Sequence, residues 1–433
     1  MTESTTHTGL SQTTGALLAV ATTICGALPT FLTSALAVQL QDELEFGPGA
    51  LGLATSVSFG MGGLASQPMG RMVQVRGSRF GMQCALALSG LSLVLVLSAP
   101  SYSFLLIALA VAGLGNAIAQ PTANLMITEM VSRHRLGVAM GVKQSYIPIA
   151  SLLGGLAVPI IAVQLGWRWA MAGAAVLCVV TIVGGRRRTR PRVPGAPPSA
   201  PAPATATATT ATSEEPTVLR EDVPPPSLLG RRALLLLTVA GALSAGSATA
   251  LGVFLVAAAV DAGVDPGTAG YLLAVCAACS LAGRVTAGWV ADRAVGRSLY
   301  LACANIMVVS VCGMVLLAAG SGWVFVLGGL LGYIGWCWPG LYHLAVIRDS
   351  PGAVASATGT VQAGFSGGAA VGPLVLGLVA EASSYRVAWL VTAVVGAVGI
   401  AAVHRARRVI RIDRGLPVRW YAGSGGDHAP TTR

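Results

Sequence analysis

The chain has 433 residues, of which 54% are hydrophobic and 10% are charged, and its mean hydropathy is +0.73. A soluble domain carries roughly 25% charged residues, so this composition excludes an ordinary water-soluble fold. The net charge of +11 would suit a nucleic-acid-binding protein, but almost all positive residues lie in the gaps between long apolar runs, so we expect no nucleic-acid partner.

An apolar helix needs roughly 20 residues to cross the hydrocarbon core of a bilayer. Twelve runs of about this length occur in the chain. They cover residues 15–38, 50–70, 80–99, 103–127, 137–161, 169–184, 233–259, 267–289, 298–319, 323–346, 354–379 and 387–403. We therefore predict an all-α membrane protein with twelve transmembrane helices, surrounded by the lipid bilayer.

The twelve runs form two groups of six, separated by a segment rich in proline, alanine and threonine. Such a segment has too few apolar side chains to fold by itself, so we expect a disordered linker. The predicted organisation is an N-terminal tail, a six-helix half, the linker, a second six-helix half and an arginine-rich tail, at residues 1–14, 15–185, 186–232, 233–403 and 404–433.

The positive residues indicate how the chain is oriented. Nearly all of them fall on one side of the predicted spans, whereas Arg168 and Arg386 fall on the other side. Lys and Arg are concentrated in the cytoplasmic loops of membrane proteins. We therefore expect a multi-pass protein of the cell membrane with both termini in the cytoplasm, and we expect it to be a monomer.

The two halves repeat each other in sequence. Adding 218 to a residue number in the first half often gives the same residue type in the second half. Chance explains such matches for alanine or glycine, but scarce types also match: Pro121 and Pro339, Gln144 and Gln362, Arg168 and Arg386. Two pseudo-symmetric halves are the plan of a secondary transporter, which binds a small-molecule substrate between the halves near mid-membrane.

Two predicted spans of the first half carry polar residues. Asn116 and Gln120 in the fourth span are four residues apart and share one helical face. They either line a substrate cavity or form hydrogen bonds between helices. Lys143 and Gln144 lie in the fifth span, with Lys143 roughly 9 Å from its start. Lys143 either lines the cavity or extends its ammonium group to the membrane surface.

The eighth span carries Arg284, about 12 Å deeper than Asp292 in the loop that follows. No Asp or Glu falls securely inside a predicted span. Two buried cations, Lys143 and Arg284, without an internal carboxylate require a negatively charged ligand. The sequence therefore predicts a small organic anion as the substrate.

The tenth and eleventh spans carry further candidates. Trp336 and Tyr342 in the tenth span, and Gln362 in the eleventh, either contact substrate or pack between helices. His343 is a candidate proton carrier because histidine titrates near neutral pH, and protons are then a candidate coupling ion. The alternative is a hydrogen-bonded histidine at the membrane surface.

The loop after the eighth span reads GWVADRAVGR at residues 288–297. It resembles the signature G-x-L-x-D-R-x-G-R-R of the major facilitator superfamily, and GRMVQVRGSR at residues 70–79 resembles a weaker copy with Gln74 in place of the aspartate. The resemblance implies alternating access between the halves. It also implies a cytoplasmic clamp in which Asp292, Arg293 and Arg297 face Arg71, Arg76 and Arg79. The alternative is that these arginines only fix the orientation in the membrane.

Two branches of this superfamily carry similar features. The position of Arg284 is similar to that of an arginine in the oxalate/formate and monocarboxylate branches, where it contacts the substrate carboxylate. Those of the oxalate type also carry a lysine on the eleventh helix, which is absent here. The segments 141–144 and 166–168 are similar to those of cyanate/nitroimidazole-type transporters.

Two other functions stay open. The chain is alternatively a multidrug or antibiotic efflux pump, although exporters of cationic drugs use a membrane-embedded acid, or a membrane sensor that carries no solute. We expect neither an enzyme nor a cofactor, because no nucleophile and base lie together in the spans. Cys276 and Cys279 have the spacing of a zinc site but lack a second pair, so we expect no metal.

Overall fold

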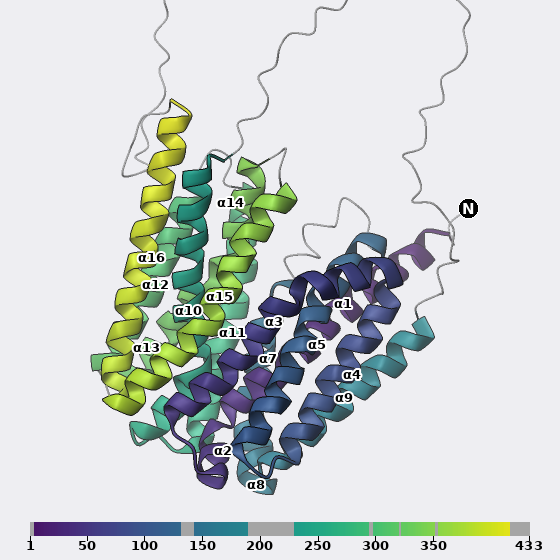
Figure 1. Cartoon of the computed structure of the whole chain (residues 1–433), viewed down its shortest axis with the longest axis vertical. Coiled ribbons are helices and arrows are strands. Elements are labelled where there is room, and N and C mark those ends of the chain that lie inside the picture. Colours follow the sequence, from purple (N-terminus) through teal and green to yellow (C-terminus); the bar gives the residue numbers. More distant parts are fainter. Residues whose placement is uncertain are drawn as a thin grey trace, which may run out of the picture.

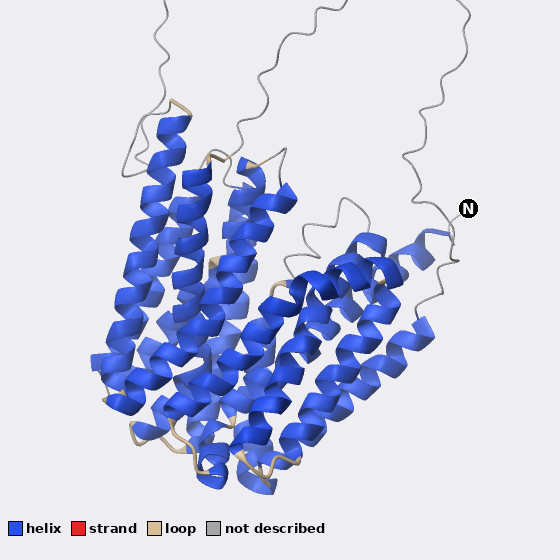
Figure 2. Cartoon of the chain, in the orientation of Figure 1, coloured by secondary structure: helices blue, strands red, loops and turns tan. Residues whose placement is uncertain are grey.

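A computed structural model describes residues 4–130, 143–188, 229–293, 298–319, 322–350 and 354–415. Over these residues the chain is helical and contains no β-strand (Figure 2). The helices of the first half are α1 (Ser4–Ala35), α2 (Ala37–Leu44), α3 (Pro48–Arg76), α4 (Ser78–Leu97), α5 (Tyr102–Met130), α7 (Tyr146–Ala157), the π-helical turn η2 (Val158–Ala162), α8 (Val163–Leu165) and α9 (Trp167–Arg188).

The second half repeats this order of long helices. Its helices are α10 (Arg231–Asp261), α11 (Pro266–Arg293), α12 (Leu299–Ala319), α13 (Trp323–Ile334), the 3₁₀ turn η3 (Gly335–Cys337), α14 (Pro339–Asp349), α15 (Val354–Ala382) and α16 (Tyr385–Asp413). With α7 to α8 and α13 to α14 each taken as one interrupted helix, six long segments occur in each half of the described chain. The predicted twelve-helix, two-half fold is confirmed.

Eleven of these segments, within the described residues, are long and apolar enough to cross a membrane. The remaining long helix is α3, which is less apolar because it carries serine, glutamine and glycine along its length. This helix packs against α15 of the other half, so it needs fewer apolar side chains than a helix that faces lipid.

The ends of two helices differ from those of the predicted spans. Helix α1 begins at Ser4 instead of residue 15, and α16 continues to Asp413 instead of ending at residue 403. The predictions followed apolar runs, whereas backbone hydrogen bonds extend a helix into polar sequence as well. Arg414 and Asp349, whose charged atoms are 3.0 Å apart, hold the end of α16 against α14. Most of the predicted linker lies outside the described residues.

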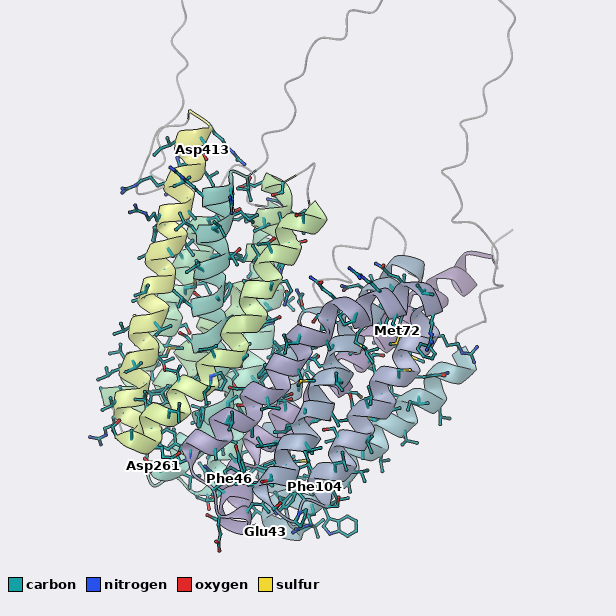
Figure 3. All side chains as sticks on the ribbon, in the orientation of Figure 1. Glu43, Phe46, Met72, Phe104, Asp261 and Asp413 are labelled. Atoms are coloured by element: carbon teal, nitrogen blue, oxygen red, sulfur yellow. The ribbon has the colours of Figure 1, made fainter. Side chains whose placement is uncertain are left out.

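The two halves lie side by side and are joined mainly at one end (Figure 1). Figure 3 shows Glu43, Phe46 and Asp261 at this end, which we call the loop end, and Asp413 at the opposite end. The opposite end, which we call the tail end, carries the start of α1 and the finish of α16, and the halves diverge toward it (Figure 1).

Glycines allow the halves to approach closely near the loop end. A methyl group added at Gly52 of α3 would lie 3.1 Å from the Cα atom of Leu374 on α15. One added at Gly155 of α7 would lie only 2.7 Å from the backbone of Ala274 on α11. Small residues bring helix backbones together in this way in membrane proteins. The loop end is therefore closed by backbone-to-backbone packing.

Polar contacts also stabilise the loop end. The indole of Trp167 donates a hydrogen bond of 2.6 Å to Glu43, and Arg168 donates one of 2.8 Å to the same carboxylate. The hydrogen bond from Arg168 holds the pKa of Glu43 below its usual value. Both charged side chains are more than one-third exposed, so the pair contributes at most about 1 kcal/mol.

A second carboxylate at the loop end joins the two halves. Helix α11 is capped within its own half, since Asp265 accepts a hydrogen bond of 3.1 Å from the backbone of Thr268. The repeat places Gly47 at the corresponding cap of α3, where no side chain can accept. Glu381 from α15 takes over this role, and accepts a hydrogen bond of 2.7 Å from the backbone N–H of Gly49.

We expect Glu381→Gln to weaken the closed loop end, because an uncharged amide is a poorer partner for a helix N-terminus. The expected change is roughly 2- to 5-fold in the equilibrium between closed and open loop ends, from about 0.3–1 kcal/mol. Spin labels at Leu165 and Trp323, which are exposed at the loop ends of opposite halves, would measure this equilibrium. Asp265→Asn is the matched control, because its carboxylate caps a helix without joining the halves; an equal effect of both variants would contradict the prediction.

Candidate functional site

Arg284 of α11 is the centre of the candidate site. Its Nη1 donates a hydrogen bond of 2.6 Å to the backbone carbonyl of Gln144, which belongs to the other half. Its Nη2 donates one of 3.2 Å to the carbonyl of Trp336, and the guanidinium carbon lies 5.9 Å from the centre of the Trp336 ring. Its Nε is buried and has no partner. The guanidinium therefore bridges the halves, and its Nε–H is left without a partner.

Lys143 lies beside this bridge. It lies three residues before Tyr146, where α7 begins. Its side chain is only 6% exposed, and no carboxylate of the described residues lies within ion-pair distance of it or of Arg284. The ammonium group therefore does not extend freely to the surface, and the two cations share one region between the halves.

His343 of α14 belongs to the same region. Its Nδ1 lies 2.9 Å from the carbonyl oxygen of Pro339, so the proton is on Nδ1 and is donated to that oxygen. Gln362 of α15 and Lys143 both lie close enough to His343 to influence it. The roles of these residues in binding and in proton transfer stay predictions.

Three other predicted site residues lie elsewhere. Tyr342 is fully buried within the second half, and its hydroxyl donates a hydrogen bond of 2.6 Å to the carbonyl of Leu237. Asn116 and Gln120 of α5 are hydrogen-bonded to each other at 3.4 Å. The backbone and side chain of Asn116 lie 3.5 Å from a methyl group built at Gly26 of α1. These contacts fit the packing alternative for all three side chains.

The predicted clamp at the tail end lies partly outside the described residues. The described part of α11 ends at Arg293, the side chains of Asp292 and Arg293 are outside the description, and Arg297 is outside it entirely. Arg71 and Arg76 are exposed at the end of α3, and the Arg76 guanidinium lies 4.9 Å from the centre of the Phe80 ring. Arg79 lies in the first turn of α4. Their pairing stays a prediction.

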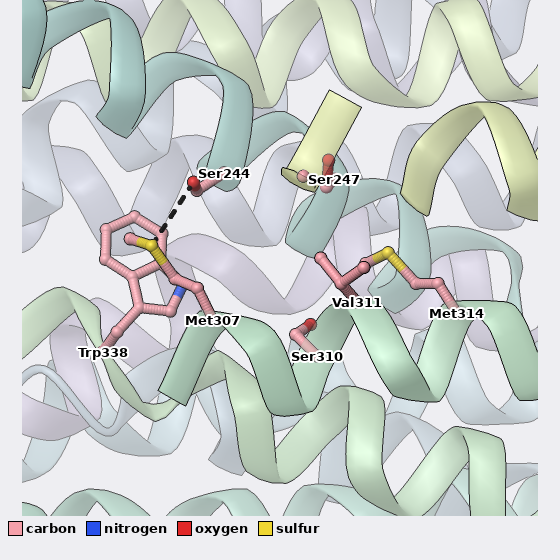
Figure 4. A pocket seen from close by; sticks show the side chains of 8 residues that line it. Ser244, Ser247, Met307, Ser310, Val311, Met314 and Trp338 are labelled. Carbon is pink, nitrogen blue, oxygen red and sulfur yellow. Dashed lines mark hydrogen bonds between the residues drawn. The ribbon is translucent and has the colours of Figure 1, made fainter. Parts of the chain in front are cut away.

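A small cavity inside the second half is not this site. It encloses about 10 Å³, which is room for one water molecule, and Figure 4 shows serines and methionines around it. Ser247 and Ser310 already donate hydrogen bonds to backbone carbonyls, at 3.2 and 3.1 Å, and Ser244 donates to the sulfur of Met307. The cavity has no charged lining residue and lies away from Arg284.

Sequence reasoning missed two features of the site. Gln144 was a candidate for binding the substrate, whereas in the structure its backbone carbonyl accepts a hydrogen bond from Arg284. Tyr146, two residues after Gln144, was not among the candidates, yet it lies near Arg284. The sequence carries a signal for the first feature, because a proline follows Gln144 at the fourth position.

Comparisons with known proteins agree with this architecture. The family model described as Major Facilitator Superfamily matches residues 18–240 and, a second time, residues 237–418. No curated protein matches the chain.

Two solved structures have a similar fold. Both are crystal structures of a bacterial homologue of the human lysosomal transporter Spinster, one inward-facing and occupied, the other inward-facing and unoccupied. The first is 16% identical with a TM-score of 0.69, and the second is 15% identical with a TM-score of 0.71. Each match covers 95% of this chain and 99% of the other. At such identities the likeness concerns the fold alone.

Proposed function

The chain belongs to the major facilitator superfamily, so it is a multi-pass membrane transporter that works by alternating access, and we propose that its cargo is a small organic anion. One observation supports this cargo. Lys143 is buried and Arg284 is partly buried between the halves, and no carboxylate among the described residues pairs with them. A buried positive charge is stable only with a compensating partner, and an anionic substrate supplies one.

The direction of opening follows from the proposed topology. Both termini lie in the cytosol in this proposal, because the arginines concentrate at the tail end. The halves diverge toward that end and are packed together at the loop end (Figure 1). The substrate region is then open toward the cytosol of the cell, and the opposite state requires the glycine contacts at the loop end to separate.

His343 gives this transporter a means of coupling to protons. Its Nδ1 proton is donated to Pro339, so its Nε2 is the position that gains or loses a proton, beside Lys143 and Gln362. A proton on Nε2 adds a positive charge next to the two cations and so favours an anion there. We propose that the anion moves together with a proton.

Uptake into proteoliposomes tests the cargo. We expect saturable uptake of at least one of acetate, lactate, malonate and oxalate, and a higher rate when an inward proton gradient is imposed. Transport of a cationic or neutral drug, with no carboxylate carried, would instead identify an efflux pump. Specific binding of a carboxylate without any flux would identify a sensor.

A further inference from the structure

We propose that Pro148 and Pro339 each free a backbone carbonyl for Arg284, and that the bond to Gln144 is a reversible link between the two halves. The link itself follows from the backbone geometry alone. Only its release by an anion rests on the proposed function.

The first carbonyl is free because of Pro148. Gln144 immediately precedes Ser145, the N-cap of α7, and for the helix to begin one residue earlier the N–H of residue 148 would have to bond to the carbonyl of Gln144. Proline has no N–H to donate. The next bond of the pattern is intact, since the N–H of Ile149 lies 3.1 Å from the carbonyl of Ser145. The carbonyl of Gln144 therefore lacks a helical partner and accepts Nη1 of Arg284 at 2.6 Å.

The second carbonyl is free for a related reason. Trp336 lies in the 3₁₀ turn η3, where a carbonyl bonds to the N–H three positions later. That position is Pro339, which again has no N–H. Nη2 of Arg284 donates to this carbonyl at 3.2 Å. The guanidinium is thus positioned by two carbonyls, one from each half, and for each of them a proline stands where the helical partner would be.

The repeat shows that the link occurs once. Pro339 has a counterpart at Pro121, but Pro148 corresponds to Ser366 and Arg284 corresponds to Ser66. The hydroxyl of Ser66 donates to the carbonyl of Gly62 in its own helix. Position 66 in the first half therefore carries no arginine, and the link joins α11 to the residue before the N-cap of α7 without a pseudo-symmetric copy.

The position of the link determines what it restrains. Gln144 precedes Gly155 by eleven residues, which is roughly 16 Å along a helix toward the tail end. The glycine contacts hold the loop end, so the Arg284 bond is a second, separate connection nearer the tail end. It restrains how far the halves separate at the tail end.

An arriving anion would release this restraint. A carboxylate accepts stronger hydrogen bonds from a guanidinium than a neutral carbonyl does. A carboxylate that displaced Gln144 would take Nη1 and could also use the Nε donor, which is buried and unpaired. Substrate binding would therefore break a connection between the halves at the same moment as it filled the site.

Pro148→Ala tests the link without changing Arg284, because alanine restores the N–H that pairs with Gln144. Spin labels carried by non-natural amino acids at Val75 and Ile412, both exposed at the tail end, report the distance between halves. We expect longer and broader distances in Pro148→Ala without ligand. Ile149→Ala is the matched control, since it shortens the neighbouring side chain on α7 and leaves its backbone N–H bonded to Ser145.

Arg284→Met removes the donor of the same hydrogen bond. It should give the same lengthening as Pro148→Ala, and the double variant should add nothing, because both changes delete one interaction. Additive effects, or distances equal to those of the wild type in both single variants, would overturn the link.

Malonate and lactate are the anion probes. In the wild type they should lengthen the tail-end distance, and in Pro148→Ala they should bind roughly 5-fold more tightly, because no carbonyl competes for the guanidinium. An unchanged affinity of Pro148→Ala for both anions would contradict the proposal that a carboxylate displaces Gln144 from Arg284. If neither probe binds the wild type and the link is nevertheless present without ligand, the cargo assignment fails and the link stands.

Discussion

Arg284→Ala is expected to lower the rate of carboxylate transport by at least about 100-fold, which corresponds to a loss of roughly 3 kcal/mol for an anion left without its buried partner. Arg284→Lys should recover part of the rate, because lysine keeps the charge but cannot form the two parallel hydrogen bonds of a guanidinium. Initial rates of uptake into proteoliposomes, at matched amounts of folded protein, give both values. The uptake rate is expected to be highest in the wild type, lower in Arg284→Lys and lowest in Arg284→Ala.

Arg386→Ala is the matched control, because Arg386 is exposed at the loop end and is the repeat counterpart of Arg168. We expect its transport rate to stay within 2-fold of the wild type, since isolated surface charges contribute less than about 1 kcal/mol. A thermal melt of each purified variant separates loss of transport from loss of folding. Undiminished carboxylate uptake by a folded Arg284→Ala variant would refute the proposed cargo.

The fold was predictable because lipid imposes one dominant requirement on a sequence. Each span must satisfy its own backbone hydrogen bonds and present apolar side chains, so length and hydropathy determine the number of helices. The repeat of scarce residues such as Pro121 and Pro339 then identified two related halves. Helix α3 shows where hydropathy stops predicting a span. It packs against the other half, and it is the one long described helix whose hydropathy is too low for a lipid-facing span.

The candidate site was only partly predictable. Charge alone made Lys143 and Arg284 candidates, because a lone cation in a membrane span needs a reason to be there, but the sequence left open whether Lys143 is buried or reaches the membrane surface. Tyr342, in contrast, shares its span with His343 but turns into the packed interior of its own half. Helical spacing places residues on a face, whereas only the packing of the other helices determines what that face meets.

Backbone groups escaped the sequence reasoning altogether. Side-chain types predict side-chain contacts, but the carbonyl of Gln144, the N–H of Gly49 and the carbonyl of Gly155 are present at every residue. The first two lack a partner in their own helix, because of Pro148 and because of the N-terminus of α3. A proline predicts which carbonyl is left free, four positions earlier. Only the tertiary structure shows which donor or helix reaches it.

Gly270→Val is expected to hold the loop end open and to lower transport by roughly 5- to 150-fold. A Cβ atom at Gly270 would lie 2.7 Å from the carbonyl oxygen of Gly155 and 2.7 Å from the Cβ atom of Val158, closer than side chains pack. Overfilling such a contact costs about 1–3 kcal/mol, and the states of a transporter differ by only a few kcal/mol. The closed loop end would therefore become the minor state.

Spin labels at Leu165 and Trp323 should then report longer distances at the loop end, while uptake falls in parallel. Gly173→Val is the matched control, because Gly173 lies within α9 and a Cβ atom there would meet nothing within 4 Å. Closed loop ends in a folded Gly270→Val variant would show that the glycine contact does not govern the equilibrium. Helix α11 contacts α7 at this glycine, and it contacts the residue before α7 at the Arg284 link. Gly270→Val and Pro148→Ala should therefore act at opposite ends of this helix pair. The first should open the loop end, and the second should loosen the tail end.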